Sequence, residues 1–198
     1  MYKKEIFTIP NILSLFRIIL AFVFLYIAAQ FGISENRMLL VSILVISGFS
    51  DFLDGKIARR FNMVSELGKI IDPIADKLTQ AVLLICCLGK YTLSRYVFVL
   101  FIIKEIYMFI NGTRTIMVTG SNDGAMWYGK VSTATFYAVM FILFLFPDIP
   151  DVAAEVMIML CGLLMLMAFI LYARHYKQLQ KETKQYNDDK KIRERKVI

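Results

Sequence analysis

The chain has 198 residues, of which 58% are hydrophobic and 20% are charged. That apolar fraction, with a mean hydropathy of +0.61, all but excludes a soluble globular protein. The net charge of +7 is uneven, since nine basic residues follow Ala173. Such a cluster beside an apolar segment is typical of contact with anionic lipid, and it gives little support to nucleic-acid binding.

The apolar stretches predict an all-α, polytopic membrane protein with six spans of about 20 residues each. They cover residues 12–31, 38–56, 73–88, 96–118, 130–147 and 152–172. Turn-forming residues separate several of them, such as the GSNDG segment that starts at Gly120. We therefore expect residues 1–172 to form one membrane domain. Residues 173–198 would be a basic cytoplasmic tail that could continue the last helix.

Basic residues near the span ends predict the orientation. Eighteen lie on the side that holds both termini, and only Arg37, Lys90 and Arg95 lie on the other side. The positive-inside rule then puts both termini, and the connection between the second and third spans, in the cytoplasm. We expect a multi-pass protein of the plasma membrane. Its first span should stay in the mature protein, because no small-residue cleavage site accompanies it.

Four aspartates lie between Ser50 and Leu78, at the edges of two apolar spans. Asp51 and Asp54 are three residues apart, so they share one face of a helix. Asp72 and Asp76 are four apart and do the same. If the two helices lie side by side, the four carboxylates repel one another unless cations lie between them. Oxygen ligands favour Mg²⁺, Mn²⁺ or Ca²⁺, whereas zinc or copper would need histidine or cysteine.

Small residues and an arginine accompany these carboxylates. Gly55, Ala58 and Gly68 allow a ligand or a neighbouring helix to approach the backbone. Arg59 returns to the face of the first aspartate, where its guanidinium could clamp a phosphate. Each residue alone also has a structural interpretation, such as a helix cap at Asp72. The whole set indicates phosphoryl chemistry at a membrane surface.

The pattern resembles the signature of the CDP-alcohol phosphotransferase family, DxxDGxxAR, eight residues, then GxxxDxxxD. The chain matches every fixed position of it: Asp51, Asp54, Gly55, Ala58, Arg59, Gly68, Asp72 and Asp76. The resemblance covers most of the chain, because the family's fold also has six spans. It implies an enzyme, dependent on Mg²⁺ or Mn²⁺, that moves a substituted phosphate from a CDP-linked lipid to an acceptor alcohol and releases CMP.

The same resemblance implies roles for the matching residues. The four aspartates would hold the metal ions, and Asp76 would also be the general base. The CDP-lipid site would be lined by Asp51, Asp54, Gly55, Ala58, Arg59 and Gly68, with Ser65 as a further phosphate contact. CDP-diacylglycerol would enter from the lipid bilayer, and the family often forms homodimers.

A closer resemblance predicts the acceptor. The segments TIPNILSLFRIIL and GKIIDPIADKL are similar to those of phosphatidylglycerophosphate synthases, whose acceptor is glycerol 3-phosphate. The candidate cationic ligands for this anion are Lys104, Arg114 and Lys130. Lys104 lies inside an apolar span, so it should face a polar cavity or pair with a carboxylate. The basic residues here differ from the usual pattern of those synthases, so a cardiolipin synthase using phosphatidylglycerol and an inositol-phosphate acceptor stay open.

Two other classes of function are alternatives. In a cation transporter, intramembrane carboxylates line an ion path. Here the acids gather at one membrane edge, beside small residues and an arginine, which favours the enzyme. A catalytically inactive scaffold would not require all eight signature positions.

Overall fold

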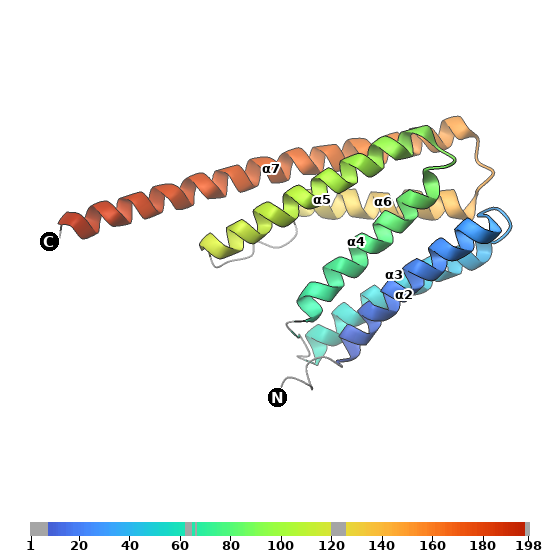
Figure 1. The fold of residues 1–198 in the computed structure, drawn as a ribbon, viewed down its shortest axis with the longest axis horizontal. Coiled ribbons are helices and arrows are strands. Elements are labelled where there is room, and N and C mark those ends of the chain that lie inside the picture. The colour runs from blue at the N-terminus through green and yellow to red at the C-terminus, as the bar shows by residue number, and fades with distance from the viewer. Residues whose placement is uncertain (1–7, 62–64, 66, 120–125, 197–198) are drawn as a thin grey trace. The chain divides into compact units, whose positions relative to one another are not determined.

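The computed structural model describes residues 8–61, 65, 67–119 and 126–196, and no strand occurs among these residues. Side chains 58, 59, 69, 116–119 and 182–196 are outside the description. The helices are α2 (Ile9–Phe31), α3 (Arg37–Arg60), α4 (Gly68–Cys87), α5 (Thr92–Thr119), α6 (Trp127–Leu145) and α7 (Asp151–Lys196) (Figure 1). The predicted all-α class is confirmed.

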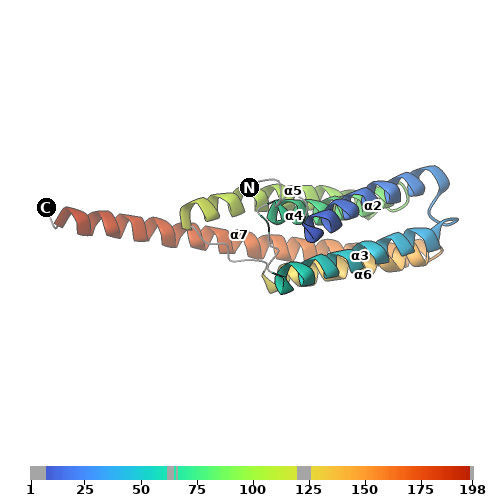
Figure 2. The same cartoon turned by 90° about the horizontal axis from the view of Figure 1, so that it is seen from below.

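Each predicted span coincides with one of these helices, and most of their ends differ by only a few residues. The largest difference at a start is in α4, which begins at Gly68 and so takes Asp72 into the helix. The largest difference at an end is in α7, which runs as one helix from Asp151 to Lys196 (Figure 2). The last span therefore continues into the polar tail as a helix.

Four of the described helices are long and apolar enough to cross a membrane. They comprise Ile9–Phe31, Arg37–Ile57, Trp127–Leu145 and Asp151–Lys181. These helices make the chain a multi-pass membrane protein. Six crossings, with α4 and α5 as the other two, stay a prediction.

The chain forms two compact units, and the first comprises Met1–Phe98 and Tyr137–Ile158. Within this unit α2 packs against both α3 and α4. The core side chains Phe24, Leu83 and Phe144 are at most 2% exposed. The ring of Phe24 meets that of Phe144 edge-on at 5.0 Å. Helix α2 is thus in contact with both helices that carry the signature aspartates.

The second unit comprises Val99–Phe136 and Met159–Ile198. A tyrosine cluster joins the start of α6 to α7 in this unit, with the rings of Tyr128 and Tyr172 4.7 Å apart. The Tyr172 hydroxyl accepts a hydrogen bond of 3.1 Å from the Met126 backbone N–H. Gly129 allows this approach, because a Cβ there would lie 2.9 Å from Tyr172 Cε2.

Candidate active site

One side of α2 carries three buried polar residues in a largely apolar helix. Asn11, Ser14 and Arg17 follow one another at intervals of three, and each is at most 2% exposed. A polar or charged group in apolar surroundings is costly unless it has a partner. All three side chains find partners between residues 51 and 76.

Arg17 lies among the carboxylates of α3 and α4. Its Nη2 is 2.9 Å from Asp54 Oδ2, and its Nη1 is 2.5 Å from Asp76 Oδ1. The same Nη1 also forms an ion pair with Asp51 Oδ1. The structure therefore brings together three of the four predicted aspartates, and it does so around a side chain from a different helix.

Asp72, the fourth aspartate, has a different partner. The Ser14 hydroxyl donates a hydrogen bond to Asp72 Oδ1. Asp72 lies inside α4, four residues after its start, so it does not cap this helix. The N-cap residue is Leu67, which makes no side-chain cap, and just before it Ser65 Oγ accepts a hydrogen bond of 2.9 Å from the backbone N–H of Gly68.

Ser65 also fixes the start of α4 against α2. Its hydroxyl donates to Asn11 Oδ1 at 2.9 Å while it accepts from Gly68. Ser65 is buried, with 7% of its surface exposed. These contacts give Ser65 a structural role, and its contact with a phosphate stays a prediction.

Gly68 is required by the close approach of α2. A Cβ at this position would lie 2.7 Å from Asn11 Oδ1 and 3.0 Å from Ser65 Oγ. We therefore expect Gly68→Ala to destabilise the protein by roughly 1 to 3 kcal/mol, as overpacking of a buried site does. Thermal unfolding in detergent measures this loss. Because Asn11→Ala removes the closer atom, Gly68→Ala should cost less in that background, and an equal cost in both would contradict this explanation.

The three clustered carboxylates differ in exposure. The side chains of Asp51 and Asp76 are 53% and 42% exposed, whereas that of Asp54 is 5% exposed. Asp54 Oδ2 is buried and makes no hydrogen bond within the described residues, although it forms an ion pair with Arg17. The cluster is therefore closed on the Asp54 side and open to a ligand at Asp51 and Asp76.

The donor set suits a hard divalent cation. The clustered side chains offer only carboxylate oxygens, which are the ligands that Mg²⁺ and Mn²⁺ prefer. Asp54 Oδ2 is also a buried oxygen that lacks a hydrogen bond in the described part of the chain. Among the residues that the structure describes, no three acidic, histidine or cysteine side chains form a metal-ligand set, and Arg17 lies between the carboxylates.

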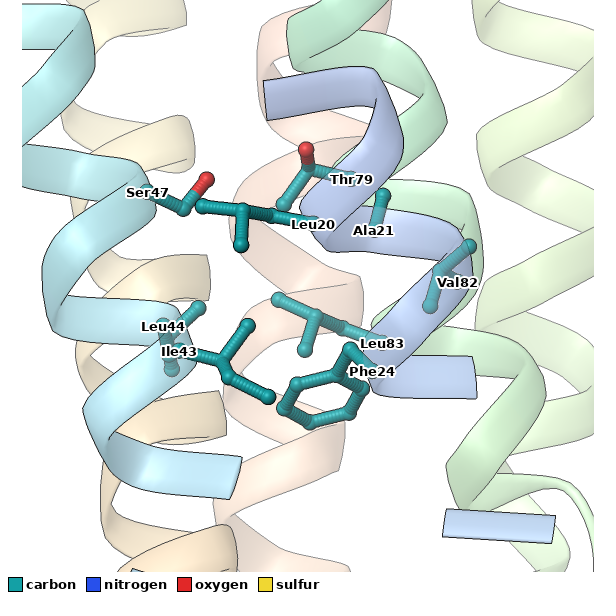
Figure 3. Close-up of a pocket in the computed structure, with 9 residues that line it drawn as sticks. All are labelled: Leu20, Ala21, Phe24, Ile43, Leu44, Ser47, Thr79, Val82 and Leu83. Atoms are coloured by element: carbon teal, nitrogen blue, oxygen red, sulfur yellow. The ribbon is translucent and has the colours of Figure 1, made fainter. Parts of the chain in front are cut away.

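An apolar pocket lies one or two helical turns from the cluster, further toward the middle of α2, α3 and α4. Its lining consists of Leu20, Ala21, Phe24, Ile43, Leu44, Ser47, Thr79, Val82 and Leu83 (Figure 3). These residues begin three positions after Arg17, four before Asp51 and three after Asp76, so they occupy the next turns of the same helices. The free space in this pocket suffices for about one water molecule. The turns of α2, α3 and α4 that follow the carboxylates toward the pocket are thus lined mostly by apolar side chains.

Several predicted site residues are not tested by these contacts. The side chains of Ala58 and Arg59 lie outside the described residues. Gly55 follows Asp54 directly in α3, on the same turn as the cluster. The roles predicted for these three residues at the CDP-lipid site stay predictions.

The three candidate acceptor ligands belong to the second unit. Lys104 is 6% exposed, and its Nζ lies 2.7 Å from Glu105 Oε1. This neighbour supplies the carboxylate partner that a lysine in an apolar helix requires. Arg114 and Lys130 are exposed on α5 and α6. Binding of the acceptor by any of the three stays a prediction.

The sequence interpretation assigned no role to Arg17. An arginine inside an apolar span does signal an intramembrane partner. The spacing to Asn11 and Ser14 also marks a polar side on α2. What these signals cannot give is the identity of the partner, because it lies 34 residues or more away along the chain.

The fold and the site define a membrane protein, helical over the residues described, in which one buried arginine contacts a cluster of three aspartates. Residues 7–178 match the family described as CDP-alcohol phosphatidyltransferase, and the chain belongs to this family. Both the family predicted from the signature and the predicted class of enzyme are confirmed.

Curated relatives carry two different names. The chain is 33% identical over 127 residues to a CDP-diacylglycerol--glycerol-3-phosphate 3-phosphatidyltransferase of Aquifex aeolicus, covering 63% of this chain and 68% of the relative. A protein of the same name from Haemophilus influenzae is 28% identical over 172 residues, 84% of this chain and 91% of the relative. A cardiolipin synthase (CMP-forming) of Streptomyces coelicolor is 43% identical over 76 residues, 37% of this chain. That match spans only 35% of the synthase's length.

Proposed function

We propose that the protein transfers the phosphatidyl group of CDP-diacylglycerol to glycerol 3-phosphate, releasing CMP and forming phosphatidylglycerophosphate. The observation that carries the chemistry is the gathering of Asp51, Asp54 and Asp76 into one cluster with two accessible carboxylates. The choice of acceptor is supported by the relatives that align over most of this chain, which bear the name of this activity.

In this reaction Asp76 is the general base. Its partly exposed carboxylate can meet an acceptor hydroxyl, whereas the buried Asp54 cannot. The contact with Arg17 at 2.5 Å orients Asp76. As Asp76 takes the hydroxyl proton, the acceptor oxygen bonds to the phosphorus and the bond to CMP breaks. Asp51, Asp54, Asp72 and Asp76 would hold a Mg²⁺ or Mn²⁺ ion, which when bound would supply charge neutralisation at the pyrophosphate.

The CDP-lipid site consists of the signature residues around this cluster. Gly55 and Ala58 leave room for the nucleotide, Gly68 allows α2 to approach beside the site, and Arg59 binds a phosphate as its type and position favour. The candidate cationic ligands for glycerol 3-phosphate are Lys104, Arg114 and Lys130, whose side chains suit a phosphate.

The second candidate function is cardiolipin synthesis with phosphatidylglycerol as acceptor. The identity of 43% over 76 residues to a cardiolipin synthase favours it. The same family and the same aspartates would serve both reactions. The longer alignments make glycerol 3-phosphate the leading proposal.

The proposed topology has six crossings, with both termini and the active site on the cytoplasmic side of the plasma membrane. It is supported by eighteen basic residues on the side of the termini against three on the other. A homodimer is the proposed assembly, on the basis of the family resemblance.

The test is CMP release by purified full-length protein in detergent, with CDP-diacylglycerol and Mg²⁺ or Mn²⁺. The acceptors to compare are glycerol 3-phosphate, phosphatidylglycerol, inositol 1-phosphate, inositol and serine. We expect selective turnover with glycerol 3-phosphate. Selective turnover with phosphatidylglycerol would replace the acceptor and keep the chemistry. No release with any acceptor, from protein shown to be folded, would contradict the proposed activity.

A further inference from the structure

We propose that Arg17 is the internal counterion of the catalytic carboxylates. Without a divalent cation, its guanidinium holds Asp51, Asp54 and Asp76 together, and it competes with the cation for them. This inference rests on the proposed function, because it takes the cation to bind at these carboxylates.

The charges of the cluster support this role. Three carboxylates contact a single guanidinium, and the Lys77 ammonium also acts on Asp76, so Arg17 alone does not balance the charge of the three. Asp72 adds another charge nearby, and its contact with Ser14 is with a neutral hydroxyl. Like charges at this spacing repel strongly. Arg17 is thus sufficient to hold the cluster together but insufficient to neutralise it, and the remaining charge suits a divalent cation.

Arg17 contacts three carboxylates without forming a bidentate pair with any one of them. A guanidinium has five N–H donors, and a bidentate pair with one carboxylate uses two of them in parallel. Here a single atom, Nη1, contacts both Asp51 and Asp76. In the described part of the chain, Arg17 Nε and Nη2 and Asp54 Oδ2 are buried and make no hydrogen bond. Arg17 and Asp54 therefore form an ion pair without a hydrogen bond, and an incoming cation can replace Arg17 as the partner of Asp54.

The direction of approach also fits competition for the carboxylates. The Arg17 side chain is 3% exposed and comes from α2. The open side of the cluster is formed by Asp51 and Asp76, which solvent reaches. A cation entering there meets oxygens that Arg17 already contacts. Two consequences follow: Arg17 lowers the affinity for the cation, and it keeps the cation-free protein folded.

The variant Arg17→Gln separates these consequences from a purely structural role. The measurements are Mn²⁺ binding, from the paramagnetic resonance of free Mn²⁺, and thermal unfolding in EDTA and in Mn²⁺, all on the full chain in detergent. We expect about tenfold tighter Mn²⁺ binding, the effect of losing a modest competing interaction. We also expect the substitution to lower the unfolding midpoint more in EDTA than in Mn²⁺. Without Arg17, only the cation can offset the repulsion between the carboxylates.

The matched control is Arg37→Gln. Arg37 also belongs to an arginine–aspartate pair, 3.5 Å from Asp148, but its side chain is 48% exposed and it starts α3, far along the helix from Asp51. An exposed pair contributes little to stability. We expect this variant to bind Mn²⁺ as the wild type does. The difference between its unfolding midpoints in EDTA and in Mn²⁺ should also equal that of the wild type.

Three results would overturn the inference. If Arg17→Gln lowers the midpoint equally in both conditions and leaves Mn²⁺ affinity unchanged, Arg17 is only structural. If Mn²⁺ affinity falls, Arg17 supports the cation instead of competing with it. If the wild-type protein binds no Mn²⁺, the metal part of the proposed function fails together with this inference. The first two results, in contrast, overturn only the role of Arg17.

Arg17→Lys covers a failure of the glutamine variant to fold. Lysine keeps the positive charge, but its single ammonium group cannot contact three carboxylates in the same way. We expect Mn²⁺ affinity between those of the wild type and a neutral variant. An affinity equal to or below that of the wild type would contradict competition.

Discussion

Asp76→Asn is expected to lower CMP release at least about 100-fold, the lower end of what a general base contributes. Asparagine keeps the shape of the side chain and an oxygen that can accept from Arg17, so the cluster should stay assembled. Binding of CDP-diacylglycerol should largely persist, because the other three aspartates are unchanged. The measurements are CMP release under saturating substrates and binding of CDP-diacylglycerol to the same preparation.

The matched control for this substitution is Asp148→Asn. Asp148 is also in the first unit and also pairs with an arginine, but its side chain is 82% exposed. Its replacement should leave both turnover and binding unchanged. Near-normal turnover by Asp76→Asn would remove Asp76 from the mechanism. If binding of CDP-diacylglycerol falls as much as turnover, Asp76 instead helps to bind this substrate, which contradicts its role as the general base.

The helical spacing of the aspartates was enough to predict most of the site. Asp51 and Asp54 share a face because residues three apart do so in any α-helix, whatever surrounds it. The same argument puts Asp72 and Asp76 on one face, although Asp76 contacts Arg17 and Asp72 contacts Ser14, and the apolar lengths of the spans identify both helices. These predictions depend on local geometry alone, so they carry over directly into the fold.

The partner of the carboxylates could not be predicted in the same way. The sequence considered alone raised the case of the second and third spans lying side by side, and in the structure α2 packs against both of them. Arg17 contacts Asp51 and Asp76 across 34 and 59 residues of chain. Which helix supplies the counterion is a property of tertiary packing, and spacing within one helix carries no information about it. The start of α4 was misjudged for a related reason, because Ser65 and Asn11 fix it through side-chain contacts.

Removal of divalent cations is expected to abolish CMP release reversibly. The proposed reaction develops negative charge on the departing CMP, and Arg17 is already engaged with three carboxylates. Treatment with EDTA should therefore reduce CMP release to background, and excess Mg²⁺ or Mn²⁺ should restore it. This recovery with EDTA still present also controls for inhibition by the chelator.

Reversibility follows from the same contacts. While the cation is absent, Arg17 partly neutralises the aspartates, and the bonds of Ser14 and Asn11 keep α4 against α2. The wild-type protein should therefore remain folded in EDTA, with an unfolding midpoint only slightly below that in Mn²⁺. Arg17→Gln lacks this counterion, so a part of its activity should not return after prolonged chelation. Full turnover in EDTA would contradict the dependence on a cation, and equal recovery of both proteins would contradict the protective role of Arg17.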